Sequence, residues 1–266
     1  MAQVVDRLLA SARYRDVDVG VLTRLAAEEL RHASNVDDAT KRVKRRLHQA
    51  VGAFRGAAPR DTFSGVRAAW RGDLRDPAFR AGCSDALAAH ASSRERVPYL
   101  DEFYARIWTL TGTPDRLIDI GSGLNPLALP WMQLPPDATY VATDVDQRPL
   151  TTVNAFLDLV GQPHVVRIGD AVAQPPADLA DVALLLKLVP TLDRQDPAAS
   201  VRLLGALHVR HAVVSFPAKS LSGRGKGMER TYRSRLDELV EESGRVREVA
   251  EASVPNELVF VLALNG

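Results

Sequence analysis

The fold is decided by the stretch Arg116-Leu117-Ile118-Asp119-Ile120-Gly121-Ser122-Gly123-Leu124-Asn125-Pro126. A short apolar run that carries an acid is followed at once by a Gly-x-Gly turn. This order is typical of the first parallel strand of a doubly wound sheet, where the turn cradles a nucleotide or nucleoside. Glycine lets the backbone approach a ligand that a Cβ atom would block. Because ordinary turns also show Gly-x-Gly, the rest of the chain has to decide between the two interpretations.

The turn departs from the dinucleotide fingerprint, which requires a third glycine packed against a helix. Pro126 stands three residues after Gly123, at the place of that glycine. A pyrophosphate resting on a helix N-terminus is therefore disfavoured. A nucleoside cofactor without phosphates suits the turn better, and S-adenosylmethionine (SAM) is the obvious candidate.

Acids follow the next two apolar segments as well. Asp144 ends the segment 139–144, where an acid is placed to accept the ribose hydroxyls of a nucleoside, although Asp146 is close enough to be confused with it. Asp170 follows the predicted strand 164–168 and suits the adenine amino group. Each acid alone has an alternative as a turn or cap residue. Acids at three successive strand ends favour a nucleoside site.

The second half of the chain predicts the rest of the sheet. Strands are expected at 181–190 and 212–216, helices at 147–159 and 229–243, and a closing hairpin at 245–251 and 257–264. The segment 181–190 is almost wholly apolar, as a buried parallel strand should be. Lys187 interrupts it near the end where ligands bind; alternatively, its stem packs against the sheet. We predict an α/β fold, a Rossmann-like SAM-dependent methyltransferase with a mostly parallel, doubly wound sheet.

Composition places limits on the function. The chain has 266 residues, 46% hydrophobic and 25% charged, as in ordinary globular proteins. A single cysteine, Cys83, excludes an internal disulfide framework and a cysteine-built zinc site. The histidines are scattered, so no metal site is expected. No stretch is long and apolar enough to span a membrane, and the N-terminus lacks a signal-peptide core. We expect a cytoplasmic protein.

Positive charge is concentrated in two regions of this nearly neutral chain. Residues 1–60 hold twelve Lys/Arg against seven Asp/Glu, and residues 217–235 hold six against one. Two basic regions indicate a polyanionic partner that is contacted at defined places.

The first basic region is predicted to be helical. Apolar spacing indicates a helix at 17–30 and a second helix that begins after Asp37 or Asp38 and runs to about Phe54. Helical spacing aligns the basic side chains of the second helix in one stripe with two flanking arginines, formed by Lys41, Lys44, Arg45 and His48 and by Arg42 and Arg46. Such a stripe suits phosphate contact; a solvated helix face is the alternative. We predict a helical RNA-binding domain at 1–80 and a methyltransferase domain at 81–266.

The second basic region follows the ligand edge of the sheet. Its glycine-rich loop lacks the spacing of a Walker loop, and Lys219, Arg224 and Lys226 are placed to grip phosphates beside a target base. Arg94 and Arg96 precede the first strand, where an arginine suits the carboxylate of a methionine moiety. A structural salt bridge is an equally good interpretation for them. The Asn/Asp-Pro-Pro-aromatic motif of exocyclic-amine methylation does not follow the fourth strand.

Together these residues resemble the aminoglycoside-resistance 16S rRNA methyltransferases that act on N7 of guanine 1405. The resemblance covers nearly the whole chain and rests on Lys41-Arg42-x-Lys44-Arg45-x-Leu47-His48 with Gly52-Ala53-Phe54, His90-x-Ser92-Ser93-Arg94-Glu95-Arg96, Asp119-x-Gly121-x-Gly123-Leu124-Asn125-Pro126, Leu185-Leu186-Lys187, Ser215-Phe216-Pro217-x-Lys219-Ser220-Leu221, Lys226-Gly227-Met228 and Asn256-Glu257-Leu258.

The resemblance implies SAM bound by Arg96 at the carboxylate, Gly121 with Gly123 at the turn, Asp144 at the ribose and Asp170 at the adenine. It also implies an N-terminal domain that docks on rRNA in the assembled 30S subunit. The target-base region would contain Lys219, Arg224, Lys226 and Met228, with Asn125 and Lys187 as candidates to position the guanine. Guanine N7 carries no proton, so no general base is required. We expect a monomer.

Two other functions stay open from the sequence. The alternatives to guanine-N7 methylation are an adenine-N1 methyltransferase of the same decoding site and a non-catalytic SAM-responsive factor that binds the 30S subunit. The methylated nucleotide distinguishes the first alternative from guanine-N7 methylation. The presence of turnover distinguishes an enzyme from the second alternative.

Overall fold

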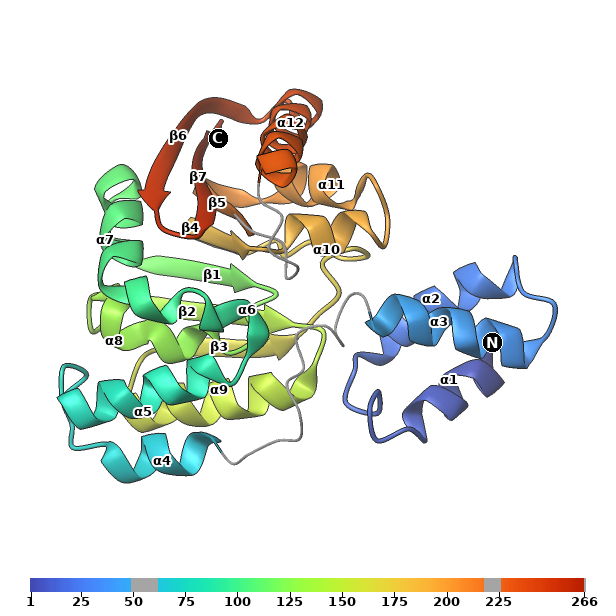
Figure 1. Ribbon diagram of the computed structural model, residues 1–266, viewed down its shortest axis with the longest axis horizontal. Helices are drawn as coiled ribbons and strands as arrows, with labels where there is room; N and C mark the ends of the chain where they lie inside the picture. Colours follow the sequence, from blue (N-terminus) through green and yellow to red (C-terminus); the bar gives the residue numbers. More distant parts are fainter. Residues whose placement is uncertain (49–61, 218–225, 266) are drawn as a thin grey trace.

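The structure, a computed structural model, describes residues 1–48, 62–217 and 226–265 and contains one seven-stranded sheet (Figure 1). The strands lie in the order β3-β2-β1-β4-β5-β7-β6. Their bounds are β1 Arg116–Ile120, β2 Thr139–Asp144, β3 His164–Ile168, β4 Leu179–Leu186, β5 His208–Pro217, β6 Val246–Val254 and β7 Glu257–Leu264. The pairs among β1 to β5 are parallel, whereas β7 is antiparallel to both β5 and β6.

Two layers of helices cover the sheet, because successive strand residues face opposite sides. Leu117 and Leu184 face one layer, and Ile118 and Leu185 face the other. The first layer comprises α4 (Thr62–Ala69), α5 (Pro77–Ala88), α7 (Leu100–Thr111), α8 (Leu129–Met132) and α9 (Gln147–Val160). The second comprises α10 (Val189–Asp193), α11 (Ala199–Ala206) and α12 (Lys226–Ser243). The predicted doubly wound α/β fold with its closing hairpin is confirmed.

The predicted fourth strand was too long. β4 ends at Leu186 rather than at residue 190, because Lys187 has a left-handed backbone with φ of +56°. The chain then enters α10, in whose first turn Pro190 lies. Proline is accepted there because the first helical amides have no intrahelical acceptor. The bend turns the residues after β4 across the end of the sheet.

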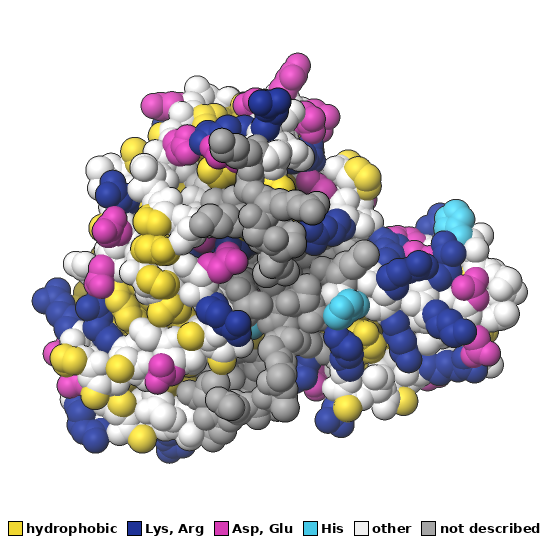
Figure 2. All heavy atoms as spheres, in the orientation of Figure 1, with side chains coloured by type: hydrophobic (Ala, Val, Ile, Leu, Met, Phe, Trp, Pro, Cys, Tyr) yellow, Lys and Arg dark blue, Asp and Glu magenta, His cyan; other side chains and the backbone are white. Residues whose placement is uncertain are grey.

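The N-terminal helices form a separate small core (Figure 1). They are α1 (Ala2–Leu9), α2 (Val19–Leu30) and α3 (Val36–Leu47), and Leu25, Val43 and Leu47 are buried between them. α3 begins two or three residues earlier than predicted, because the side chain of Asn35, not Asp37 or Asp38, caps it by accepting from Asp38 N at 2.9 Å. The predicted continuation to Phe54 lies outside the described residues. Figure 2 shows Lys and Arg side chains gathered over this helical domain.

Helices α4 and α5 belong by packing to the sheet. Val66 of α4 and Phe79 of α5 lie in the same core as Leu117. The short helix α6 (Ala91–Arg94) leads from α5 toward α7. The division of the chain at residue 80 stays a prediction, and this packing leads us to propose a boundary that precedes residue 62.

Candidate cofactor site

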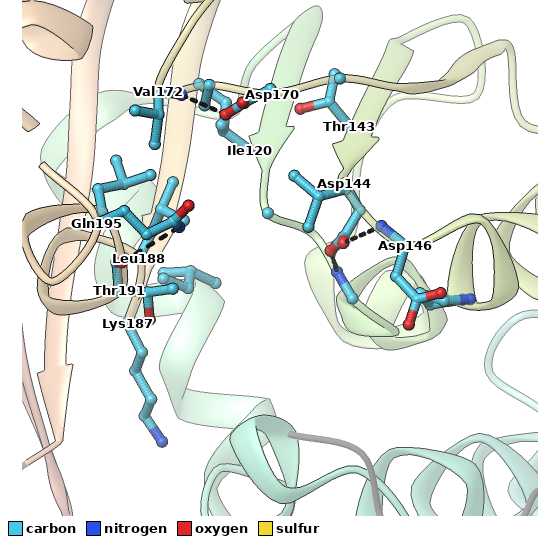
Figure 3. A pocket seen from close by; sticks show the side chains of 18 of the residues that line it. Ile120, Thr143, Asp144, Asp146, Asp170, Val172, Lys187, Leu188, Thr191 and Gln195 are labelled. Carbon is cyan, nitrogen blue, oxygen red and sulfur yellow. Dashed lines mark hydrogen bonds between the residues drawn. The ribbon is translucent and has the colours of Figure 1, made fainter. Parts of the chain in front are cut away.

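A cavity opens at the carboxyl ends of the first four strands (Figure 3). It is lined by His90, Ile120, Gly121, Gly123, Thr143, Asp144, Val145, Asp146, Pro149, Gly169, Asp170, Ala171, Val172, Leu186, Lys187, Leu188, Thr191, Leu192 and Gln195. In parallel sheets of this kind ligands bind at this edge. The structure therefore brings together four of the five residues predicted for the cofactor, Gly121, Gly123, Asp144 and Asp170.

The glycine turn after β1 has a conformation that other residues adopt with strain. Gly121 has φ of +68°, and a Cβ atom there would lie 2.8 Å from Cδ1 of Leu188. Gly123 has φ of +51°, and its Cβ would lie 3.1 Å from Cε1 of His90. Both glycines are thus required by backbone angle and by space. Their bare backbone forms part of the cavity wall.

Asp144 is held at the end of β2 by two backbone amides. Its Oδ2 accepts from Gly123 N at 2.8 Å, and its Oδ1 accepts from Asp146 N at 2.9 Å. Burial raises the pKa of Asp144 to about 6. A carboxylate offers about four acceptor positions, so two remain for ribose hydroxyls. Asp146 has a different task, because its side chain caps α9 by accepting from Arg148 N at 3.3 Å.

Asp170 follows the neighbouring strand β3, and the residue before it, Gly169, donates its amide to the backbone oxygen of Asp144 at 2.9 Å. Oδ1 of Asp170 accepts from Val172 N at 3.0 Å, and its Oδ2 accepts from Arg24 Nε at 2.8 Å. Ile120, Val172, Leu188 and Leu192 add apolar surface to the cavity. Two carboxylates with apolar side chains between them fit a nucleoside, whose ribose and amino group donate hydrogen bonds and whose base is flat and apolar on its faces.

Arg96, the predicted clamp for a carboxylate, does not line the cavity. Its side chain is 5% exposed, and it donates to Glu257 through Nη2 at 2.7 Å and Nε at 3.2 Å. Its Nη1 donates to Oδ1 of Asn125 at 3.0 Å. The guanidinium also stacks over Phe103, 4.3 Å from the ring centroid. The role of Arg96 toward SAM stays a prediction, and its contacts are those of the alternative salt bridge.

Asn125, predicted to position the guanine, is likewise buried and does not line the cavity. Its Oδ1 accepts from Tyr104 OH at 2.8 Å as well as from Arg96, and its Nδ2 donates to Asp119 at 2.9 Å. Asp119 also accepts from Tyr140 OH at 2.7 Å, and burial raises the pKa of Asp119 to about 6. Together with three further buried residues we call this set the buried polar network; it comprises Arg96, Tyr104, Asp119, Asn125, Tyr140, Lys187, Ser215 and Glu257.

Glu257 joins the two cations of this network. Burial alone would raise its pKa, but the charges of Arg96 and Lys187 lower the pKa of Glu257 below the ordinary value. Ser215 donates its hydroxyl to the same carboxylate. The network therefore balances its buried charges internally.

Lys187 is the member of the network that also lines the cavity. Its Nζ lies 2.8 Å from Oε2 of Glu95 and 3.8 Å from Oε2 of Glu257, and its amide donates to Oγ of Ser215 at 3.0 Å. Figure 3 shows its side chain extending from the end of β4. The ammonium group is thus positioned by two acids at the cavity edge.

His90 is a cavity residue to which sequence reasoning gave no role. Burial lowers the pKa of His90 to about 4, so the imidazole is neutral at pH 7. It packs against Gly123 in the turn. A lone histidine has no spacing signal; the available hint was its place in the segment that leads to Arg94 and Arg96. Gln195 and Thr191 were missed for the same reason.

The cations of α3 divide into two groups. Lys41, Arg45 and His48 are exposed and Lys44 is half-buried. By contrast, Nε of Arg42 lies 2.6 Å from Oε2 of Glu29, and Nη1 of Arg46 lies 2.6 Å from Oε2 of Glu28. Their predicted roles in RNA binding stay predictions, and the first group has the geometry for it.

Only some of the residues predicted near the target base lie within the described part of the chain. Lys219 and Arg224 lie outside the described residues. Lys226 begins α12, and Met228 is half-buried in the first turn of that helix. Met228 does not line the cofactor cavity.

The glycine turn and two carboxylates at the carboxyl edge of this sheet define a SAM-dependent methyltransferase of the Rossmann-like class. Residues 10–261 match the family model described as "Ribosomal RNA methyltransferase (FmrO)", and the chain belongs to this family. Within the described residues, no helix is long and apolar enough to cross a membrane.

Curated relatives and solved structures agree with this family. A 16S rRNA (guanine(1405)-N(7))-methyltransferase of Frankia casuarinae is 39% identical over 98% of this chain and 94% of its own length. The enzyme of the same name from Micromonospora echinospora is 36% identical over 98% and 95%. The crystal structure of 16S rRNA methyltransferase RmtF in complex with S-adenosyl-L-homocysteine superposes with a TM-score of 0.82, at 31% identity, and covers 99% of this chain and 98% of that one.

Proposed function

We propose that this protein transfers a methyl group from SAM to N7 of guanine 1405 in 16S rRNA, and thereby confers aminoglycoside resistance. The full-length similarity to enzymes named for this reaction carries the proposal. The cavity supports it, because it pairs a glycine turn with acids suited to ribose and adenine.

The chemistry places modest demands on the chain. Bound SAM supplies a methyl group activated by its sulfonium charge. Guanine N7 has an in-plane lone pair and no proton, so the chain needs no general base. Its tasks are to take the guanine out of the stack and to align N7 with the methyl group. His90, whose pKa burial lowers to about 4, is a weak base, which agrees with a reaction that needs none.

Individual roles follow from the contacts. We assign the ribose hydroxyls to Asp144, the adenine amino group to Asp170 and the close backbone approach to Gly121 and Gly123. Lys187, held by Glu95 at the cavity edge, is placed to position the target base. Asn125 and Arg96 act below the cavity, through the network that supports the turn. Met228 and the basic residues Lys219, Arg224 and Lys226 are assigned to the target-base region on the resemblance alone.

We propose the assembled 30S subunit in the cytoplasm as the physiological partner and a monomer as the active form. The exposed cations Lys41 and Arg45 lie on the same side of α3 as the exposed His48 at its C-terminal end, as phosphate contacts on folded rRNA require. These contacts position the enzyme, while the target-base region selects the nucleotide.

The proposal is tested by incubating the protein with 30S subunits and labelled SAM and mapping the modified nucleotide. We expect methylation at N7 of guanine 1405. Modification of a decoding-site adenine at N1 would establish the alternative enzyme, and tight 30S binding without label transfer would establish the non-catalytic factor. Asp144→Asn is the matched control, because it keeps the size of the side chain and removes the charge that receives the ribose.

A further inference from the structure

The helical domain contacts the lining of the cofactor cavity at two places. On the ribose side, residues 16–18 run antiparallel to the segment that follows β2. Asp18 N donates to Val145 O at 2.8 Å, and Gln147 N donates to Asp16 O at 2.8 Å. Val145 lines the cavity and directly follows Asp144. The backbone behind the ribose-binding acid is thus attached to the helical domain.

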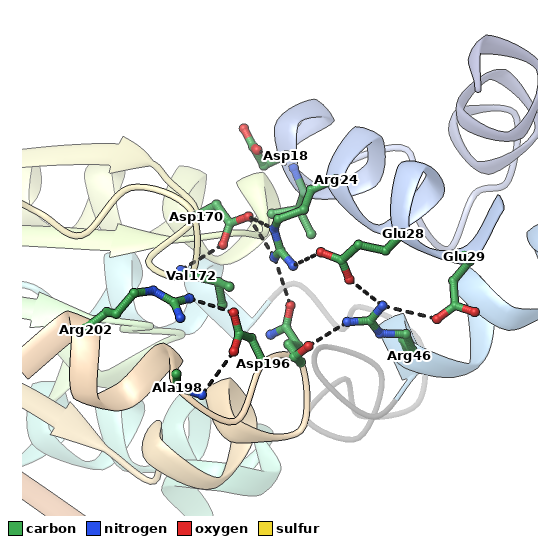
Figure 4. Close-up of polar contacts among 12 residues, drawn as sticks. Asp18, Arg24, Glu28, Glu29, Arg46, Asp170, Val172, Asp196, Ala198 and Arg202 are labelled. Atoms are coloured by element: carbon green, nitrogen blue, oxygen red, sulfur yellow. Dashed lines mark hydrogen bonds and ion pairs between the residues drawn. The ribbon is translucent and has the colours of Figure 1, made fainter. Parts of the chain in front are cut away.

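On the adenine side, Arg24 of α2 reaches into the cavity wall (Figure 4). Its Nε and Nη2 lie 2.8 and 2.7 Å from Oδ2 of Asp170. The same Nη2 donates to Oε1 of Gln195 at 3.1 Å. Asp170 and Gln195 both line the cavity. One guanidinium from the helical domain therefore fixes two cofactor-site side chains.

This contact is shielded from water. The side chain of Arg24 is 17% exposed and that of Asp170 is 8% exposed. Both guanidinium nitrogens contact one carboxylate oxygen, and a charge-assisted pair that is shielded from water is stronger than an exposed ion pair. Because Oδ1 of Asp170 accepts from Val172 N and keeps one acceptor position for an amino group, Arg24 orients this carboxylate without blocking it.

The basic helix α3 is joined to the same place. Nη2 of Arg46 donates to the backbone oxygen of Gln195 at 2.7 Å, and its Nη1 lies 2.6 Å from Oε2 of Glu28. Oε1 of Glu28 lies 3.6 Å from Nη1 of Arg24. A continuous set of polar contacts therefore runs from the basic helix through Gln195 and Arg24 to Asp170 (Figure 4).

We propose that Arg24 is a positioning residue of the cofactor site, and that through Arg24 and Arg46 rRNA docking and cofactor binding stabilise each other. The second part rests on the proposed function. When rRNA holds α3 in place, Gln195 and Asp170 are held in the orientation that receives the adenine. Binding linkage makes the effect reciprocal, so bound cofactor tightens rRNA binding by the same factor. Arg46 thereby serves the domain contact rather than a phosphate.

The first test measures S-adenosyl-L-homocysteine binding to the full chain by calorimetry, without methyl transfer. We expect Arg24→Ala to weaken binding about tenfold, within the usual range of coupling between sites. Arg24→Lys should recover part of this loss, because a lysine keeps the charge but cannot contact Asp170 and Gln195 with one fork. The matched control is Arg7→Ala, which removes an exposed ion pair with Asp37 inside the helical domain and should bind like wild type.

The second test measures 30S affinity with and without S-adenosyl-L-homocysteine. In wild type, S-adenosyl-L-homocysteine should increase the 30S affinity severalfold. In Arg24→Ala and in Arg46→Ala, the 30S affinity should be nearly the same with and without S-adenosyl-L-homocysteine. Arg46→Ala leaves the Arg24–Asp170 pair in place and should keep most of the cofactor affinity. A loss of coupling in this variant therefore cannot be explained by misfolding of the cofactor site.

The outcomes separate this inference from the proposed function. If Arg24→Ala binds S-adenosyl-L-homocysteine as tightly as wild type does, the positioning role is contradicted. If S-adenosyl-L-homocysteine leaves the 30S affinity of the wild-type protein unchanged, the coupling is contradicted. If guanine 1405 is methylated but Arg24→Ala binds the cofactor product normally, only this inference fails. If guanine 1405 is not methylated, the proposed function fails, while calorimetry still decides the role of Arg24.

Discussion

The cofactor cavity and the buried polar network lie at the same end of the sheet and use similar residues, yet their charges have different partners. In the cavity, Asp144 and Asp170 accept hydrogen bonds from the chain and retain acceptor positions for a ligand. In the network, Arg96 and Glu257 bind each other and are buried. The difference teaches that a charged residue in a functional motif either contacts the ligand or stabilises the residues that contact it.

Removing a charge that faces the ligand should have the largest effect. Asp144→Ala deletes the acceptor for two ribose hydroxyls, and hydrogen bonds to charged groups contribute about 1.5–3 kcal/mol each. We expect cofactor affinity to fall about a hundredfold or more, measured by calorimetry. Asp146→Ala is the control, since Asp146 caps α9; it should lower the free energy of unfolding by about 1 kcal/mol and change affinity little. Equal losses in both variants would contradict the assignment.

Removing a charge from the network should instead affect stability. Glu257→Ala leaves Arg96 and Lys187 without their shared acid, and an uncompensated buried charge costs about 3–5 kcal/mol. Chemical denaturation should show a loss of this size in the free energy of unfolding. An unchanged denaturation midpoint would show that the network is not a scaffold.

The pH dependence of cofactor binding also distinguishes the acids of the cavity from those of the buried polar network. The pKa of Asp144 is raised by burial to about 6, and ribose hydroxyls favour its ionised form. Cofactor affinity should therefore be constant above about pH 7 and fall below pH 6, by at most about tenfold per pH unit for one proton. Asp144→Asn should remove this dependence. A decline that persists in the variant would point to another acid, such as Asp119, whose pKa is also about 6.

The same acids make stability depend on pH in the opposite direction. For Asp119 the folded-state pKa, about 6, exceeds the ordinary value of 3.8, so the folded protein holds the proton more tightly. The free energy of unfolding should therefore decrease as the pH rises from about 4 to 6 and then level off. Because acids such as Glu257 have a lowered pKa and act in the opposite direction, denaturation midpoints of wild type and Asp119→Asn are compared across this window, and the same pH dependence in both proteins would contradict the raised pKa of Asp119.

The smallest expected effect concerns helix α3. Its cations also divide into those that are exposed and those that are paired within the protein. Arg45 is exposed, whereas Arg42 is paired with Glu29. Arg45→Ala should weaken 30S binding severalfold and reduce the salt dependence of log K by about one phosphate contact. Arg42→Ala should leave the salt slope near its wild-type value. Titrations over a range of KCl concentrations compare the two, and a reversed order would show that the ion pair with Glu29 opens on rRNA.

The sequence predicted well what depends on neighbouring residues. The sheet followed from apolar segments, and Asp144 and Asp170 followed from their places at strand ends. The end of β4 was misjudged because apolar residues continue past Lys187, and only the backbone angle shows the bend. Asn35 was missed as the cap of α3 because two aspartates stand close behind it.

Contacts between distant residues could not be predicted. The partner of Arg96 lies 161 residues away in the closing hairpin, so spacing could not distinguish a ligand clamp from a buried salt bridge. Arg24 and Asp170 are separated by 146 residues. The division of the α3 stripe likewise depends on Glu28 and Glu29 of the neighbouring helix.

The central claim is that the cavity holds SAM for methylation of one guanine of 16S rRNA. Mapping of the modified nucleotide on 30S subunits, with wild type and Asp144→Asn side by side, tests it most directly. The account predicts N7 methylation at guanine 1405 by wild type and its near loss in the variant. Methylation at another nucleotide, or equal methylation by both proteins, would contradict it.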